Sequence, residues 1–126
     1  MEFKKFNYKK FFKSFTYASK GVVNLFKTEQ NARFHIITAT VAGVFAYFLH
    51  FTRIEATILF FAIISVLSIE IINTAIEKLL DLVHPESHKQ IEFIKDALAG
   101  AVLVASIVAF VVGILLFYPH IADLVS

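Results

Sequence analysis

Two carboxylates and an amide stand at helical spacing from one another in the middle of the chain. Glu70, Asn73 and Glu77 are separated by three and four residues, so on an α-helix they share one face. The segment just before them, Ala56–Ile69, is uncharged and strongly apolar. Ionisable groups inside a membrane are costly and usually mark a functional site. The complete polar stripe is Glu70, Asn73, Thr74, Glu77 and Asp81.

The spacing of the two glutamates predicts separate roles for them. Seven residues of helix place Glu70 and Glu77 about 10.5 Å apart along the axis, too far for both to chelate one ion. Glu77 is predicted as a metal ligand and Glu70, which lies deeper, as a base. Glu29 is a second candidate ligand, and Lys95 with Asp96 could neutralise and position a phosphate. The stripe could instead serve helix packing through hydrogen bonds, and spacing does not decide between the two.

Composition indicates one membrane-embedded domain over residues 1–126. The chain is 58% hydrophobic with 15 phenylalanines, and its mean hydropathy is +0.73. It has no cysteine, which excludes disulfides and thiolate metal sites. A glycine-rich phosphate-binding loop of the G-x-x-x-x-G-K-[ST] type is also absent. We expect no cleavable signal peptide and no nucleic-acid partner.

The expected fold is all-α, with a surface helix followed by three transmembrane helices. Lysines and aromatic residues interleave over residues 1–30, which predicts a basic amphipathic helix on the membrane surface. Gly21 could bend or break this helix, and Pro119 is expected to end the last one. The three predicted spans are residues 34–51, 54–83 and 93–118.

Charge distribution predicts the orientation. Residues 1–27 contain seven lysines (4, 5, 9, 10, 13, 20 and 27) and a single acidic residue, Glu2. The positive-inside rule therefore places the N-terminus in the cytoplasm, and three crossings place the C-terminus outside. With this topology Glu29, the polar stripe and Lys95–Asp96 all converge on the cytoplasmic side, where ATP and magnesium are available.

Several motifs together resemble the prokaryotic diacylglycerol kinase family, which includes the undecaprenol kinases. The resemblance covers about residues 10–118. Its most specific parts are the stripe Glu70-x-x-Asn73-Thr74-Ala75-Ile76-Glu77-x-x-x-Asp81 and the segment Lys95-Asp96-x-x-Ala99-Gly100-Ala101-Val102. The other matching segments are Phe15-Thr16-Tyr17-Ala18 with Gly21, and Glu29-x-Asn31-x-Arg33.

The resemblance implies an enzyme of the bacterial cytoplasmic membrane that works as a homotrimer with shared active sites. Such enzymes transfer the ATP γ-phosphoryl group to a lipid hydroxyl with Mg²⁺. By motif, Glu70 resembles the general base, Glu29 and Glu77 the metal ligands that also contact ATP, and Asn73 a member of the catalytic cluster. Lys95 and Asp96 resemble a catalytic, phosphate-contacting pair, and Ala99 lies beside the lipid. Further ATP contacts are implied at Lys10, Tyr17, Glu86, Ser87 and His88.

Two questions stay open at this point. The lipid acceptor could be undecaprenol or diacylglycerol, although the Glu29-x-Asn31-x-Arg33 segment is closer to the undecaprenol kinases. The alternative function is a small non-enzymatic oligomeric membrane protein, an ion pathway or a transporter accessory. A continuous ion pathway would want ionisable groups in both halves of the membrane, and the apolar stretches Ala56–Ile69 and Ala97–Tyr118 provide none in the outer half.

Overall fold

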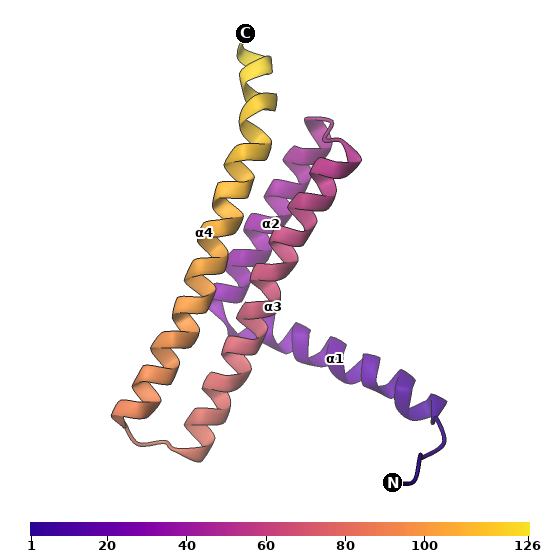
Figure 1. Ribbon diagram of the computed structural model, residues 1–126, viewed down its shortest axis with the longest axis vertical. Coiled ribbons are helices and arrows are strands. Elements are labelled where there is room, and N and C mark those ends of the chain that lie inside the picture. The colour runs from indigo at the N-terminus through magenta and orange to yellow at the C-terminus, as the bar shows by residue number, and fades with distance from the viewer.

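The computed structural model describes residues 1–126 and contains four α-helices and no strand. Helices α2, α3 and α4 lie side by side as an elongated bundle, and α1 projects away from it (Figure 1). Helix α3 contacts both α2 and α4, so it is the central element of the bundle. The helices are α1 (Tyr8–Thr28), α2 (Gln30–Phe48), α3 (Arg53–Val83) and α4 (Lys89–Val125).

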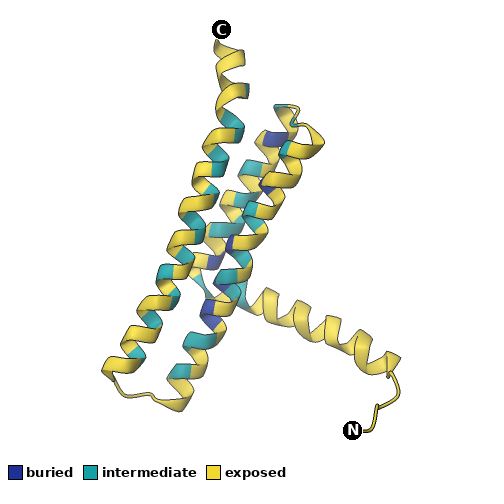
Figure 2. Ribbon diagram, in the orientation of Figure 1, coloured by how far each residue is buried: buried dark blue, intermediate teal, exposed yellow.

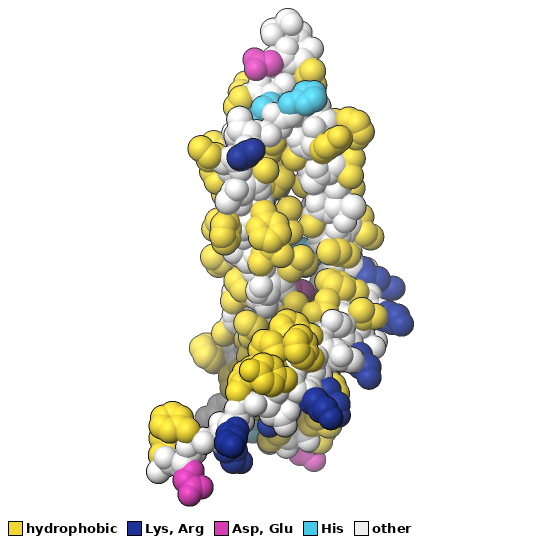
Figure 3. All heavy atoms as spheres, turned by 90° about the vertical axis from the view of Figure 1, so that its right-hand side faces the viewer, with side chains coloured by type: hydrophobic (Ala, Val, Ile, Leu, Met, Phe, Trp, Pro, Cys, Tyr) yellow, Lys and Arg dark blue, Asp and Glu magenta, His cyan; other side chains and the backbone are white.

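Helix α1 is shorter than the predicted surface helix. It begins only at Tyr8, because the Asn7 side chain accepts a hydrogen bond from the Lys10 backbone N–H at 3.1 Å and caps the helix. It then continues through Gly21 without the break that the sequence allowed. The helix is amphipathic and none of its residues is buried. Figure 3 shows its lysines beside a cluster of exposed aromatic side chains, as a helix on a membrane surface requires.

The extended backbone of Glu29 separates α1 from α2, with φ −106° and ψ 120°. Helix α2 has 19 residues, so it is about 28 Å long, close to the thickness of a hydrocarbon core. Only α3 and α4 are long and apolar enough by composition to be candidate membrane spans. The α2 sequence carries Arg33, His35 and two threonines, which lower its hydropathy. A third span through α2 therefore stays a prediction.

Helix α3 carries most of the buried positions. It starts with a capping box, in which the Thr52 side chain accepts from the Glu55 backbone N–H and the Glu55 side chain accepts from the Thr52 N–H. Only seven of the 126 residues are buried (Figure 2). Most apolar side chains therefore face outward, where lipid or other protein chains must cover them. The buried residues are Ala32, Ala46, Leu59, Val66, Glu70, Asn73 and Thr74.

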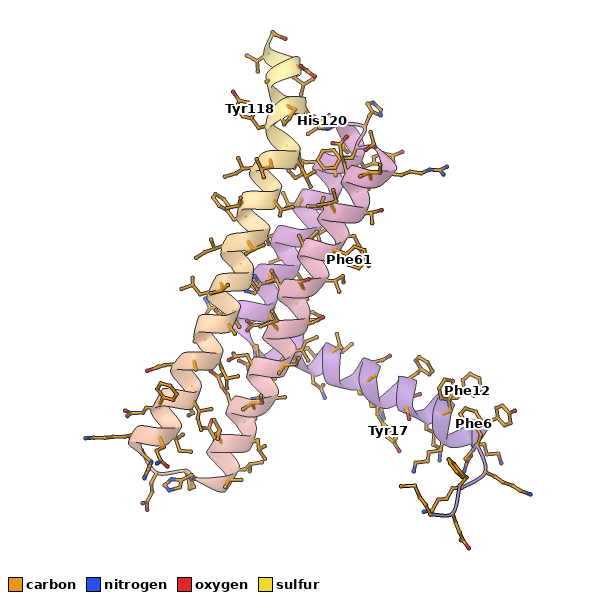
Figure 4. The ribbon with its side chains drawn as sticks, in the orientation of Figure 1. Phe6, Phe12, Tyr17, Phe61, Tyr118 and His120 are labelled. Atoms are coloured by element: carbon orange, nitrogen blue, oxygen red, sulfur yellow. The ribbon has the colours of Figure 1, made fainter.

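The prediction that Pro119 ends the last helix is wrong. Pro119 lies inside α4, which continues to Val125. A proline costs one backbone hydrogen bond, but its fixed φ is compatible with helix. The next residue, His120, bonds through its ring to the Glu55 side chain and stacks on Phe51 at 4.8 Å between ring centroids. These contacts join α4 at His120 to the start of α3, and the last turn of α4 extends beyond them (Figure 4). The helix also begins at Lys89, four residues before the predicted start.

Candidate active site

The polar stripe of α3 contains the most buried polar side chains in the protein. Glu70 is 3% exposed, Thr74 is 4% exposed and Asn73 is 8% exposed. The Asn73 Oδ1 atom is buried and has no hydrogen-bond partner. A buried polar atom without a partner costs free energy, so such atoms call for a partner or a functional role. Asn73 Oδ1 is thus free to accept a hydrogen bond.

His35 of α2 faces Glu70 across the helix interface. Its Nε2 atom lies 3.9 Å from Glu70 Oε2, and both side chains are mostly covered. The two attract each other when the imidazole is protonated. The sequence prediction treated Glu70 without this neighbour. The only clue to this contact in the sequence was the position of His35, six residues after Glu29 in the helix that packs against the stripe.

Glu29 and Glu77 lie on the side of Glu70 toward the α1–α2 junction. Glu77 shares the polar face of α3 with Glu70, two turns further along, and Glu29 lies against the same helix; the three residues are called the carboxylate cluster below. Glu77 is partly covered, and Glu29 forms an ion pair with Lys78 of α3 at 3.2 Å. Lys78 was not among the predicted site residues. The fold thus brings together the three predicted carboxylates from α3 and from the residue before α2.

A second ion pair joins the predicted site residues of α3 and α4. Lys95 Nζ donates to Asp81 Oδ1 at 2.6 Å, and Asp81 lies one helical turn after Glu77 on α3. Asp81 and Lys95 are separated by the turn that contains Pro85. The pair therefore holds a cationic side chain near the outer rim of the carboxylate cluster.

Several predicted site residues are not joined to this cluster within one chain. Asp96 and Ala99 are exposed on α4. Tyr17 projects from α1, clear of the three-helix bundle (Figure 4). Lys10 is exposed on the same helix, and its side chain makes no hydrogen bond or ion pair. The connecting residues Glu86, Ser87 and His88 are exposed, and their side-chain contacts are with neighbouring connector residues and the first turn of α4.

An apolar groove runs along the bundle from the position of His35. Its volume is about 750 Å³, and 14 of its 18 lining residues are hydrophobic. The lining side chains come from α2, α3 and α4, from Phe34 near the carboxylate cluster to Ile121 near the far end of α4. Since His35 also contacts Glu70, a long apolar molecule in the groove could present a polar end to that carboxylate.

The oxygen atoms of Glu29, Glu77 and Asn73 suit a hard cation whose remaining ligands come from a bound substrate. No three side chains among His, Cys, Asp and Glu lie close enough together to hold a metal ion by themselves. Magnesium usually takes one or two carboxylates and completes its shell with water and phosphate oxygens. Glu29 and Glu77 offer carboxylate oxygens, and the unpartnered Asn73 Oδ1 is a further oxygen nearby. These residues fit a magnesium–nucleotide complex better than a resident metal.

The model of the prokaryotic diacylglycerol kinase family matches residues 16–117. The chain belongs to this family. It is 36% identical over 112 residues to an undecaprenol kinase of Bacillus subtilis, covering 89% of this chain and 91% of that protein. It is 38% identical over 112 residues to a diacylglycerol kinase of Synechocystis, covering 88% of this chain and 64% of that protein. A diacylglycerol kinase of Escherichia coli is 31% identical over 104 residues, covering 82% of this chain and 85% of that protein.

Membership confirms the resemblance found in the motifs and indicates a lipid kinase. Together with the two long apolar helices, it identifies a bacterial membrane protein. The non-enzymatic alternative is not favoured, because the related proteins are named as kinases. The family match spans Glu29, the whole α3 stripe and Lys95–Asp96, so it includes every side chain of the carboxylate cluster.

Proposed function

We propose that this protein transfers the γ-phosphoryl group of ATP to the hydroxyl group of a membrane lipid alcohol, either undecaprenol or diacylglycerol. The observation that carries the proposal is the buried carboxylate of Glu70. It lies against His35, which lines the apolar groove, and shares one face of α3 with Glu77, beyond which Asp81 pairs with Lys95. A lipid hydroxyl and a nucleotide phosphate could therefore meet at this point.

In the proposed reaction, the lipid oxygen forms a bond to the γ-phosphorus while the bond from that phosphorus to the β–γ bridging oxygen breaks. Glu70 accepts the hydroxyl proton, and ADP leaves with the electron pair of the broken bond. Lys95 neutralises charge on the phosphate oxygens, held in place by Asp81 at 2.6 Å. Burial of Glu70 also excludes water, which would otherwise compete as the acceptor.

Glu29 and Glu77 are the proposed residues for holding Mg²⁺, with Asn73 as a further oxygen donor to the bound complex. When bound with ATP, the cation neutralises the charge that develops on the transferred group. The proposed ATP contacts of Lys10, Tyr17, Asp96, Glu86, Ser87 and His88 follow from the family motifs, as does the position of Ala99 beside the lipid. A homotrimer with shared active sites would explain why exposed Asp96 and Ala99 lie outside the cluster of their own chain.

The proposed arrangement in the membrane has one domain, residues 1–126, with α2, α3 and α4 crossing and α1 on the cytoplasmic surface. Two features support it: α1 is rich in lysine, and the ion pairs Glu29–Lys78 and Asp81–Lys95 lie in the half of the bundle that contains the α1–α2 junction and the α3–α4 turn. The C-terminus is then outside. Accessibility of single cysteines placed at residues 5 and 125 tests this orientation, and labelling of both from the same side contradicts it.

The test of the function is a side-by-side assay of purified protein with Mg²⁺–ATP and each lipid. We expect phosphorylation of at least one, and the ratio of the two rates identifies the acceptor. The Glu29-x-Asn31-x-Arg33 segment is closer to the undecaprenol kinases, which favours undecaprenol as the faster substrate. Activity on neither lipid would return attention to the non-enzymatic alternative.

A further inference from the structure

Lys78 provides the only polar contact of the Glu29 side chain. Lys78 Nζ lies 3.2 Å from Glu29 Oε1, and the Glu29 carboxylate makes no other hydrogen bond or ion pair. Glu29 is the N-cap residue of α2, but its side chain makes no capping hydrogen bond, so the carboxylate is free for other contacts. A cation from the neighbouring helix thus already occupies the position beside this carboxylate.

The ion pair between Glu29 and Lys78 is weak enough for another cation to replace the lysine. Its side chains are 31% exposed at Glu29 and 62% exposed at Lys78, and an ion pair of such exposure contributes only about 0–1 kcal/mol. Lys78 has no other ion-pair partner. One lysine therefore neutralises the charge of Glu29 without holding it tightly.

We propose that Lys78 is the resting counter-ion of Glu29, which holds that carboxylate in position and competes with the divalent cation for it. This inference rests on the proposed function, because it takes Glu29 as a ligand of the magnesium–nucleotide complex. When a divalent cation binds, it replaces the ammonium group, and the flexible lysine side chain moves into solvent. Lys78 is therefore a positioning residue that sets the concentration of divalent cation at which the site fills.

The test measures cation binding directly. Binding of Mn²⁺ with the non-hydrolysable analogue AMP-PNP is followed by electron paramagnetic resonance in the wild type, Lys78→Gln, Lys78→Met and Lys78→Arg. Loss of the competing charge should lower the Mn²⁺ dissociation constant by about two- to fivefold in the Gln and Met variants. The Arg variant keeps the charge and should stay within about twofold of the wild type.

Lys27→Gln is the matched control. It removes the same charge from the last turn of α1, two residues before Glu29, but Lys27 takes part in none of the ion pairs of the structure. We expect its Mn²⁺ affinity to equal that of the wild type. An equal tightening in this control would show a general charge effect and overturn the proposal.

The remaining outcomes also test the role of Lys78 as a counter-ion. Unchanged Mn²⁺ affinity in both Lys78→Gln and Lys78→Met would overturn the counter-ion role, and weaker binding would overturn it in favour of a direct phosphate contact. Lipid phosphorylation by the wild type, measured on the same preparations, separates this proposal from the function. Absence of phosphoryl transfer rejects the function, whereas normal transfer with equal Mn²⁺ affinities rejects only the role of Lys78.

Discussion

Replacing Glu70 with glutamine tests the base directly, because it removes the proton acceptor while keeping the shape of the side chain. Glu70 is 3% exposed, so no water can easily take its place. Loss of a general base reduces the rate by about 10²–10⁴, which corresponds to about 2.7–5.4 kcal/mol of activation free energy. We expect Glu70→Gln to lose this amount in kcat, with little change in the affinity for Mg²⁺–ATP.

The same substitution should leave the fold intact. The contact between Glu70 and His35 is long, at 3.9 Å, so removing the Glu70 charge lowers the free energy of unfolding only slightly. Glutamine keeps the size and shape of the glutamate side chain, so the packing around residue 70 is retained. We therefore expect the free energy of unfolding to change by less than about 1 kcal/mol.

The assay compares initial rates of lipid phosphorylation and melting temperatures for the wild type, Glu70→Gln and a control, Asp123→Asn. The control makes the same carboxylate-to-amide change at the exposed C-terminal end of α4, and we expect wild-type rates from it. A Glu70→Gln rate within about tenfold of the wild type, in a folded protein, would refute the assignment of Glu70 as the base.

Three further predictions follow from the same contacts. Asn73→Ala should show a smaller rise in melting temperature on adding Mg²⁺ and AMP-PNP than the wild type, because the unpartnered Oδ1 is gone; an equal rise would contradict its contact with the bound complex. Glu77→Gln should require more Mg²⁺ for half-maximal activity, and an unchanged magnesium titration would exclude Glu77 as a ligand. Glu55→Gln and His120→Gln should each lower the melting temperature, since each breaks the hydrogen bond between the start of α3 and α4. Their magnesium titrations should match the wild type, and altered titrations would show that the far end of the bundle is coupled to the site.

The helices and the stripe could be predicted because they depend on local patterns. Apolar length located α3 and α4, and the three- and four-residue spacing placed Glu70, Asn73 and Glu77 on one face. The buried side chains of Glu70 and Asn73 agree with that face pointing into the bundle. Charge distribution along the chain predicted that Glu29 and Lys95 would lie near the stripe, and both form ion pairs with residues of α3, Lys78 and Asp81.

Contacts between helices were not predictable in the same way, because they depend on how each helix is rotated and shifted against its neighbour. His35 beside Glu70 and Lys78 beside Glu29 are contacts of this kind. The continuation of α4 past Pro119 is another, since the local rule that proline ends a helix is outweighed by the contacts of His120 with Glu55 and Phe51. The sequence alone does not say how far neighbouring helices are shifted along each other, so it could not predict any of these pairs.

The most direct test of the central claim follows the γ-phosphate itself. Purified protein in lipid bilayers receives ATP labelled at the γ-phosphate, Mg²⁺, and either undecaprenol or diacylglycerol, and the lipids are extracted and separated. We predict label in undecaprenyl phosphate or phosphatidic acid for the wild type and at least about 100-fold less for Glu70→Gln. Label that stays in ATP, or is released only as inorganic phosphate, would contradict the assignment of this protein as a lipid kinase.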